Sequence, residues 1–442
     1  MMADGERLLL RPPRMALPTP AAEECLLNPC GASRLPATCQ FLPATAEIFI
    51  RPGSLRSYAL VMDSQTLTLT GPSALAVIRA SRLAGGPALM PTSLTKVPRS
   101  ARRLPSDEAL AALLPCLAPA IGHGDGLFLR VSDEADRVRK GTVACRLSRG
   151  SFSEGSLWEV SPPDQCRAAA AAIDEGALDL RLLVDAPPLA LASRASFLCQ
   201  RDREQGRAPG SFETYVRILA DELELCGRYG RDPLDPTSAT CIDDLRPVTS
   251  RGELEGFLSS EMTGKGAGPR MMRQGLPFVV DGLRSPLESA THLCMTQSPH
   301  WGGLSFPSYE CNGRLDLPDG ATTTTGLGHI SPDFLWRDAS VALETEGYAT
   351  HGTRAGRVKD NRRLRFYNDC GVTVFPALFD EVCTRRGMDS VLAGLAHALC
   401  ERSGERGALM ERRFKRTFSD RTGMQRRNVI LGTLLPTRRN DE

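Results

Sequence analysis

The sequence predicts an α/β protein in which a mixed sheet flanked by helices forms the C-terminal part and an α+β domain precedes it. The C-terminal prediction rests on three apolar runs, at 334–336, 341–346 and 372–379, with a helical segment at 356–369 between the last two. The size fits this class, because 442 residues with 41% hydrophobic composition can fill the cores of two or three domains.

The N-terminal half divides into a leader and a first folded unit. Residues 1–45 are rich in Pro, Ala and Arg, which is typical of a flexible segment. Residues 46–250 contain the expected α+β domain, to which the sequence alone assigns no role. Its strands are expected at 47–52, 57–63, 126–132 and 156–162, and its helices at 71–83, 168–173 and 212–225.

A helix-turn-helix would make this first unit a reader of DNA sequence, but the pattern argues against one. The helix expected at 71–83 is followed by Gly85-Gly86-Pro87 and then by Pro91. These residues interrupt a second helix at the distance that the motif requires.

Charge, hydropathy and cysteine spacing are typical of a soluble protein in a reducing compartment. Lys and Arg (54) nearly balance Asp and Glu (52), so any surface that binds nucleic acid would have to be local. The chain has no run of about 20 apolar residues and no signal-peptide core at its start, so no membrane span is expected. The 14 cysteines form no C-x-x-C pair, which favours reduced thiols and a cytoplasmic location.

Acidic side chains converge in the C-terminal sheet. Asp333 opens the first of two strands that we expect to be antiparallel neighbours, with Arg337-Asp338 in the turn between them. Because side chains alternate along a strand, Glu344 and Glu346 share one face and approach Asp333 across the pair. Converging carboxylates repel one another, and a hard divalent cation such as Mg²⁺ is the usual reason to tolerate this.

Each acid also has a simpler explanation. Asp333 follows Ser-Pro and could be a turn residue, while Glu344 and Glu346 could lie on the solvated face of an edge strand. The context of the second strand favours a functional role, because VALETEG is followed by a helix and by the apolar run VTVFPALF. This order is typical of a central strand, where acids are costly unless they are used.

Five short motifs follow one another between about residues 283 and 385. They are Ser285-Pro286-Leu287-Glu288, Pro332-Asp333, Glu344-x-Glu346-Gly347 with His351 four residues later, Lys359-Asp360-x-Arg362-Arg363-Leu364, and Gly371-Val372-x-Val374. Their order and spacing resemble the domain of unknown function related to very-short-patch-repair endonucleases, which belongs to the PD-(D/E)XK nuclease superfamily. The resemblance implies a restriction-endonuclease-like sheet for residues 251–400.

The resemblance also implies roles for individual residues. Asp333 and Glu344 would bind Mg²⁺ or Mn²⁺. Glu346 stands where the superfamily usually has a Lys that orients the attacking water and stabilises negative charge, a role that a carboxylate cannot fill. Lys359, on the next helix, is the candidate for a relocated cation, since Lys is rare in this Arg-rich chain. Chance is the alternative explanation for its position.

Glu288 and His351 each have two readings. Ser285, Pro286 and Glu288 have the pattern of a capping box, in which the Glu holds a helix start together. The resemblance implies in addition that this helix supplies an acid to the site, and the two roles are compatible. His351 could bind a metal or a phosphate, or it could be a solvated loop residue.

Two basic segments suit a polyanion such as DNA. The helix at 356–369 carries Arg357, Arg362 and Arg363, which could contact phosphates. Its packing face is expected at Val358, Asn361, Leu364 and Tyr367 or Asn368. The tail at 401–442 is also basic, and a solvated helix face is an equal explanation there.

Together these features predict a Mg²⁺- or Mn²⁺-dependent endonuclease that hydrolyses DNA phosphodiester bonds. The catalytic candidates are Asp333, Glu344, Glu346, Lys359 and Glu288, and the nucleic-acid candidates are Arg357, Arg362, Arg363 and His351. One alternative is an inactive nuclease fold that acts as a DNA-binding regulator or type IV antitoxin, to which this domain is often linked in sequence. A protein-interaction scaffold is the other.

Overall fold

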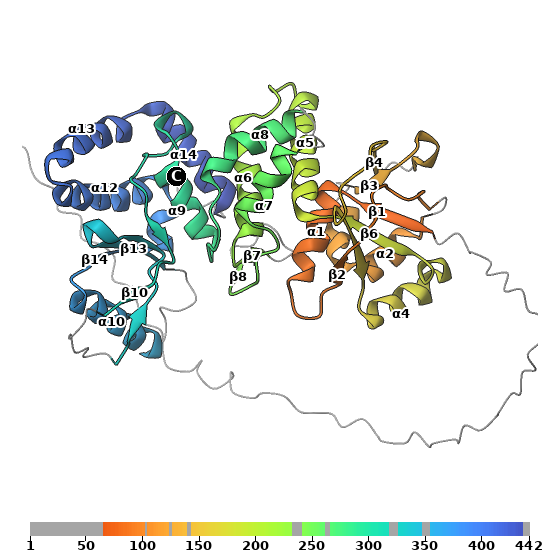
Figure 1. Ribbon diagram of the computed structural model, residues 1–442, viewed down its shortest axis with the longest axis horizontal. Coiled ribbons are helices and arrows are strands. Elements are labelled where there is room, and N and C mark those ends of the chain that lie inside the picture. Colours follow the sequence, from red (N-terminus) through yellow and green to blue (C-terminus); the bar gives the residue numbers. More distant parts are fainter. Residues whose placement is uncertain are drawn as a thin grey trace, which may run out of the picture. The chain divides into compact units, whose positions relative to one another are not determined.

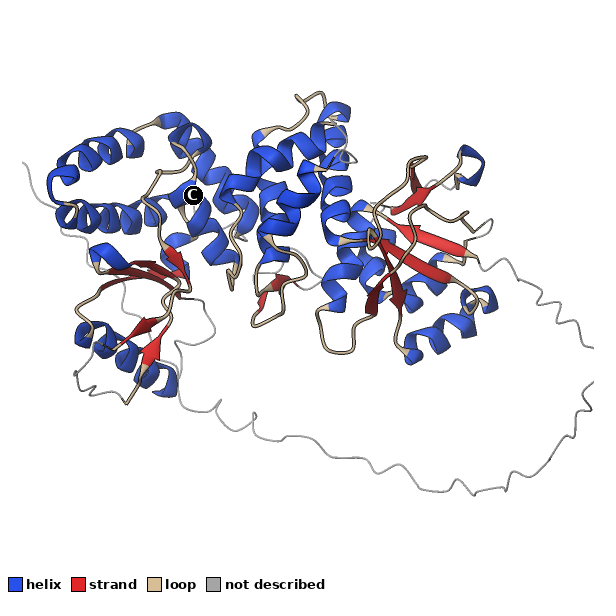
Figure 2. Cartoon of the chain, in the orientation of Figure 1, coloured by secondary structure: helices blue, strands red, loops and turns tan. Residues whose placement is uncertain are grey.

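The structure is a computed structural model with two open mixed sheets and many helices, coloured red and blue in Figure 2. It describes residues 65–101, 104–122, 126–138, 143–231, 241–260, 266–317, 326–346 and 354–435, without the side chains of residues 346, 354–360 and 405. The described residues belong to one unit, Val61–Glu442. The expected leader at 1–45 and the strands expected at 47–52 and 57–63 lie outside them.

The first sheet contains six strands and fits the expected α+β region. In sheet order they are β2 (Ala88–Pro91), β5 (Leu157–Ser161), β6 (Arg181–Asp185), β1 (Thr66–Leu69), β3 (Leu127–Val131) and β4 (Val143–Leu147). The central strands β1 and β6 are parallel, and all four residues of β1 are buried. The strands predicted at 126–132 and 156–162 are confirmed as β3 and β5, whereas β1 and β6 were not predicted.

Short helices follow the strands of this sheet (Figure 1). They are α1 (Gly71–Ser81), α2 (Asp107–Leu113), α3 (Ala118–Gly122) and α4 (Asp164–Ile173), with 3-10 turns at η1 (Pro115–Leu117), η2 (Glu134–Asp136) and η3 (Glu175–Ala177). Helix α1 contacts β3 and β6, and α2 packs on α4. A turn and then strand β2 follow α1, as expected from Gly85-Gly86-Pro87, so no helix-turn-helix forms there.

A buried ion pair joins strands β3 and β6 of the first sheet, and three hydroxyl groups bind to it. Arg130 of β3 binds Asp185 at the end of β6 with two bonds, Nε to Oδ1 at 2.7 Å and Nη2 to Oδ2 at 2.5 Å. The hydroxyl of Thr70 donates to the same carboxylate at 2.5 Å, and the hydroxyls of Ser148 and Ser193 accept from Arg130. Arg130 and Asp185 are 2% and 0% exposed, so each charge depends on the other.

A group of helices follows the first sheet in sequence. They are α5 (Pro187–Glu204), α6 (Phe212–Cys226), α7 (Arg251–Ser259), α8 (Ala267–Gly275), η4 (Leu276–Phe278) and α9 (Pro286–Thr296), with the two-residue strands β7 (Gly230–Arg231) and β8 (Cys241–Ile242) between α6 and α7. Helix α5 packs on α1, α6 and α8, and α6 contacts α9. No helix in the described ranges is long and apolar enough to cross a membrane.

The basic tail expected at 401–442 contributes two packed helices. They are α13 (Gly407–Phe418) and α14 (Arg421–Leu434), with η7 (Gly404–Arg406) before them. Helix α14 packs against α6 and α9. Arg427 is 0% exposed and donates from Nε to Asp389 at 2.7 Å and from Nη1 to the carbonyl of Gly302 at 3.1 Å. Arg427 therefore belongs to the packed interior and not to a solvated helix face.

The loop that follows α9 packs against neighbouring helices. It contains η5 (Pro299–Trp301), and the Trp301 ring lies 4.6 Å from that of Tyr215 and beneath the guanidinium of Arg426. Gly302 has φ +89°, and a Cβ there would lie 2.8 Å from the Cβ of Arg426. Only glycine allows this close approach of the turn to α14.

The second sheet is mixed and has the order β14-β13-β12-β9. Its strands are β9 (Glu310–Cys311), β12 (Phe334–Trp336), β13 (Val341–Glu346) and β14 (Thr373–Leu378). The predicted hairpin is confirmed, since β12 and β13 are antiparallel and the turn η6 (Arg337–Ala339) joins them. Strand β14 is parallel to β13, which is therefore central, as expected.

Helices α10 and α12 lie on opposite sides of this sheet (Figure 1). Helix α10 (Arg354–Asp369) follows β13, whereas α11 (Phe379–Val382) and α12 (Arg385–Arg402) follow β14. Leu335 and Ala342 pack with α10, while Phe334 and Leu343 belong to the main core with α12. The small hairpin of β10 (Leu315–Asp316) and β11 (His329–Ile330) joins the core on the α10 side.

The packing face predicted for α10 is confirmed at Tyr367 and wrong at Asn361 and Leu364. Leu364 is 45% exposed and Asn361 is exposed, whereas Phe366 and Tyr367 are 0% and 1% exposed. The packing stripe runs through half-buried Arg363 and through buried Phe366 and Tyr367. Two aromatic rings bury more apolar surface than Leu364 and Asn361 would, so they set the rotation of the helix.

We predict that Arg130→Met destabilises the protein by about 3–5 kcal/mol, because it leaves the Asp185 carboxylate buried without a counter-charge. Asp185→Asn on that background should recover part of the loss. Urea unfolding measures both. Arg181→Met is the matched control: it removes the half-exposed pair with Glu159 and should cost less than about 1 kcal/mol. Equal costs for the two Arg variants would contradict the prediction.

Candidate functional site

Asp333 and Glu344 face each other at one end of the second sheet. Phe334 pairs with Leu343 in the antiparallel register, which places Asp333 opposite Glu344 on the face that α10 covers. Asp333 Oδ2 accepts two hydrogen bonds from Thr345, one from its backbone N–H and one from its hydroxyl, both at 2.7 Å. These donors fix the Asp333 carboxylate where the β12–β13 ladder ends.

The Glu344 carboxylate is bound by two side chains of α10. Its Oε1 accepts hydrogen bonds from Arg363 Nη2 and from the hydroxyl of Tyr367. Burial lowers the pKa of Arg363, but the adjacent Glu344 charge and hydrogen bond raise it overall. Burial and the same charge raise the pKa of Tyr367 above its ordinary value. Both donors therefore keep their protons.

Glu288 closes the start of α9 and also reaches the site. The Ser285 hydroxyl accepts from the Glu288 N–H at 3.0 Å and donates to Glu288 Oε1 at 3.2 Å. Glu288 Oε2 takes the backbone N–H of Arg284 at 2.9 Å, where a standard capping box would use that of Ser285. Asn312, beside β9, donates to the same oxygen at 3.4 Å. Both sequence readings of Glu288 are thus compatible with its position.

The three acids act on one another electrostatically. Burial, and then the charge of Asp333, raise the pKa of Glu288 to about 8. Burial, and then the charge of Glu344, raise the pKa of Asp333 to about 6, although the Thr345 bonds and Arg363 oppose the shift. Burial raises the pKa of the Cys311 thiol to about 12, with smaller contributions from Glu288 and Asp333. Burial is the largest cause of all three shifts, and the neighbouring carboxylates add to it.

The donor set suits a hard cation that keeps part of its water. Asp333 Oδ1 and Glu344 Oε2 accept no hydrogen bond from another described residue. Among the described ranges, no group of three or more acidic, His or Cys side chains is arranged to hold a metal. Mg²⁺ is commonly bound by one or two carboxylates together with water and substrate phosphates, so two carboxylates fit it.

The other predicted site residues have different outcomes. Glu346 belongs to β13, and Arg357 and Lys359 belong to α10, but their side chains lie outside the described part of the chain. His351 lies outside it entirely. Arg362 is exposed, as a phosphate-binding residue would be, and it makes no ion pair with another described residue.

Three residues at the site were not predicted to be there. Thr345 and Asn312 bind carboxylates, and Tyr367 was expected only to pack. Tyr367 follows Arg363 by four residues, so the two share one face of α10, and this spacing could have indicated a shared partner. No comparable signal marks Asn312, because its proximity depends on the placement of β9.

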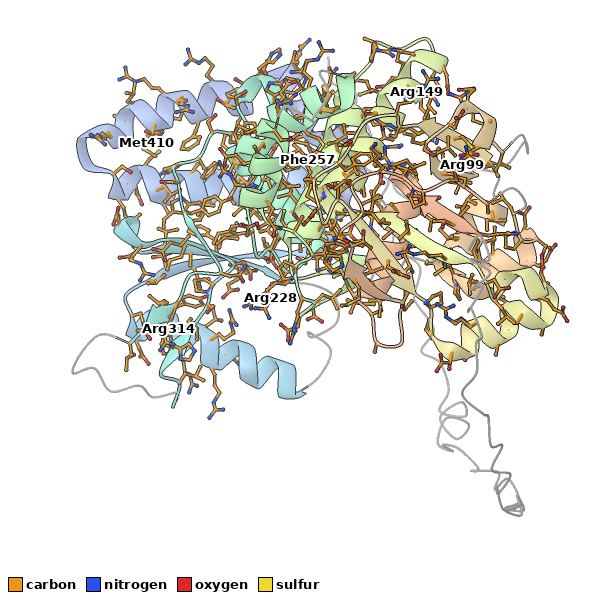
Figure 3. All side chains as sticks on the ribbon, turned by 45° about the vertical axis from the view of Figure 1, so that its right-hand side comes forward. Arg99, Arg149, Arg228, Phe257, Arg314 and Met410 are labelled. Carbon is orange, nitrogen blue, oxygen red and sulfur yellow. The ribbon has the colours of Figure 1, made fainter. Side chains whose placement is uncertain are left out.

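Other exposed arginines near the second sheet are neutralised locally. Arg337 in the β12–β13 turn binds Glu310 with two bonds, at 2.8 and 2.6 Å. Arg314, labelled in Figure 3, is 64% exposed and binds Asp316 at 2.7 Å. Exposed ion pairs of this kind contribute little to stability, and their net charge is small.

Comparison with known proteins adds no assignment. The chain matches no protein-family model, no curated protein and no solved structure among those compared. The resemblance of residues 283–385 therefore stays a prediction that rests on their motifs.

We predict that Glu288 makes the stability of the protein fall as pH rises from about 5 to 9. Its folded-state pKa, about 8, lies above the ordinary carboxyl value, so the folded state binds the proton more tightly. Glu288→Gln removes this ionisation. Its stability relative to the parent should therefore improve by at least ~1 kcal/mol between pH 5 and pH 9 in urea unfolding.

Glu253→Gln is the matched control for this measurement, because Glu253 is the N3 glutamate of the standard capping box of α7 and lies at the surface. It should cost a similar amount at both pH values. A difference between Glu288→Gln and the parent that is the same at pH 5 and pH 9 would contradict the predicted ionisation.

Proposed function

We propose that residues 251–400 form a PD-(D/E)XK-type nuclease that hydrolyses phosphodiester bonds of DNA with Mg²⁺ or Mn²⁺. The observation that carries the proposal is the pair Asp333 and Glu344. Two largely buried carboxyl groups lie opposite each other at one end of a mixed sheet, and the charge of one raises the pKa of the other. Such an arrangement is costly unless a cation compensates it.

The order of elements around the pair supports the proposal. Helix α9 precedes strands β9, β12 and β13, and helix α10 and strand β14 follow them. The resemblance implies this order, with one acid from the helix and one from each of two adjacent strands. Glu288, Asp333 and Glu344 occupy these three positions.

In the proposed mechanism the carboxylates of Asp333 and Glu344 hold the cation. A bound divalent cation would polarise the scissile phosphate and acidify a water. The ionised form of Glu288 would act as the base for that water, because a pKa of about 8 makes this form a stronger proton acceptor than an ordinary carboxylate. The hydrogen bonds from Ser285 and Arg284 would hold its two oxygens in place during the proton transfer.

A cation from α10 would complete the site. Glu346 cannot stabilise the negative charge of the transition state, so Lys359 or Arg363 would supply the positive charge. The two residues are four apart and therefore share one face of the helix. Exposed Arg362 would contact the DNA backbone.

A second candidate function, a DNA-binding regulator or antitoxin without cleavage, has its own support. Glu344 already has a positive partner in Arg363, and no group of three or more metal-ligating side chains occurs among the described residues. If the ion pair with Arg363 keeps a cation from binding, the fold would bind DNA and not cut it. Cleavage assays separate the two functions.

We predict that the protein nicks supercoiled DNA in the presence of Mg²⁺ or Mn²⁺ and that Asp333→Asn abolishes nicking while DNA affinity is retained. The amide keeps the shape of the carboxylate but loses the charge that holds the cation. Gel assays and fluorescence anisotropy measure the two properties. Asp338→Asn, in the exposed turn of the same hairpin, is the control and should nick like the parent. Nicking by Asp333→Asn at the parental rate would refute the metal site.

The role of Lys359 can be tested in the same assay. If Lys359 stabilises the transition state, Lys359→Ala should lower turnover about 10²- to 10³-fold with little change in DNA affinity. Lys359→Arg should rescue only partly, because a guanidinium is bulkier and more delocalised. Lys96→Ala is the control, because Lys96 is exposed and lies in the segment between strand β2 of the first sheet and helix α2. Weaker binding with unchanged turnover would instead assign Lys359 to phosphate contact.

A further inference from the structure

Arg363 is placed where it controls access to Glu344. Its Nη2 binds Glu344 Oε1, and the same nitrogen lies 3.4 Å from the carbonyl oxygen of Ser331, between β11 and β12. The Glu344 side chain is only 13% exposed, whereas that of Arg363 is 32% exposed. The guanidinium thus bridges a largely buried acid and the surface.

A guanidinium and a metal cation compete for Glu344. Each would neutralise the same carboxylate, and two positive charges so close together repel each other. Tyr367 does not compete, because it is uncharged, only 1% exposed and packed in the core beside Phe366. Arg363, and not Tyr367, therefore opposes the binding of a cation to Glu344, even at Oε2, which accepts no hydrogen bond from another described residue.

The long side chain of Arg363 can move outward without disturbing the core. Its side chain is about one-third exposed, and the adjacent Arg362 is exposed as well. A DNA phosphate that approaches this edge offers a guanidinium two oxygens in the geometry it binds best. Substrate phosphate is thus a chemically matched alternative to the carboxylate.

We propose that Arg363 is a substrate-controlled gate: it occupies Glu344 in the free protein and moves to a DNA phosphate when substrate binds, which releases Glu344 to the cation. This inference rests on the proposed nuclease function. It means that DNA and the divalent cation each strengthen the binding of the other, since the coupling between two ligands is reciprocal. The free protein would then carry little metal.

The opposite role for Arg363 is a fixed support. In that case its bond to Glu344 persists when the cation is bound and orients the carboxylate, as outer partners of metal ligands do. The two roles predict opposite effects of removing the guanidinium. Loss of a gate strengthens binding of the cation in the absence of DNA, whereas loss of a support weakens it.

The first experiment measures Mn²⁺ affinity by electron paramagnetic resonance for the parent, Arg363→Gln and Arg365→Gln, without DNA. The gate predicts that Arg363→Gln binds Mn²⁺ about tenfold more tightly than the parent. Arg365→Gln removes the same charge from an exposed position about 200° further round α10 and should match the parent. Equal or weaker binding by Arg363→Gln would overturn the gate.

The second experiment repeats the titration with a short DNA duplex, using Asp333→Asn with the same duplex to subtract Mn²⁺ bound to DNA alone. The parent and Arg365→Gln should gain affinity for Mn²⁺ by about tenfold, and Arg363→Gln should gain little, because its Glu344 is already free. A gain of the same size in all three proteins would overturn the gate.

Failure of the gate and failure of the nuclease site give different results. If Asp333→Asn binds Mn²⁺ as tightly as the parent without DNA, and Arg363→Gln also equals the parent, the cation is not bound at these acids and both proposals fall. If Asp333→Asn loses Mn²⁺ binding while Arg363→Gln is no tighter than the parent, the site stands and only the gate falls.

Discussion

The carboxyl groups of Asp333 and Glu344 lie opposite each other across the β12–β13 pair, and the surrounding structure compensates for their repulsion. Thr345 donates twice to Asp333, while Arg363 and Tyr367 donate to Glu344. These partners come from two separate elements, β13 and α10. The acids can therefore adopt this arrangement only when the hairpin and the helix have both packed, which makes the site a product of the complete sheet.

The C-terminal elements could be predicted because the turn residues that end them lie close to them in sequence. The Arg337-Asp338 turn and the apolar runs on either side define the β12–β13 hairpin within a few residues. The first sheet offered weaker signals, since β1 is the short run Thr66–Leu69 and β6 follows a polar segment. Their parallel pairing joins segments far apart in sequence, and no local pattern encodes such a pairing.

The candidate site could likewise be predicted where it depends on local patterns. Strand alternation and the hairpin register are enough to bring Asp333 and Glu344 together, and a capping pattern is enough to place Glu288 at a helix start. The sequence assigned the cation at the acids to Lys359, whose side chain lies outside the described residues. Arg363, which the sequence assigned to DNA phosphates, contacts Glu344. Its contact depends on the rotation of α10, which Phe366 and Tyr367 set through burial that the sequence pattern did not rank correctly.

The packing of α14 has a consequence for how the chain is made. Its buried side chains Ile430, Leu431 and Leu434 join the core that includes α6 and α9, yet α14 is translated after the whole second sheet. During translation, helices α6 and α9 expose an apolar surface until α14 has been made. Exposed apolar surface favours binding by chaperones. A premature stop codon or proteolytic cleavage before Arg421 would thus remove more than basic residues. It would expose the core around α6 and α9 to solvent.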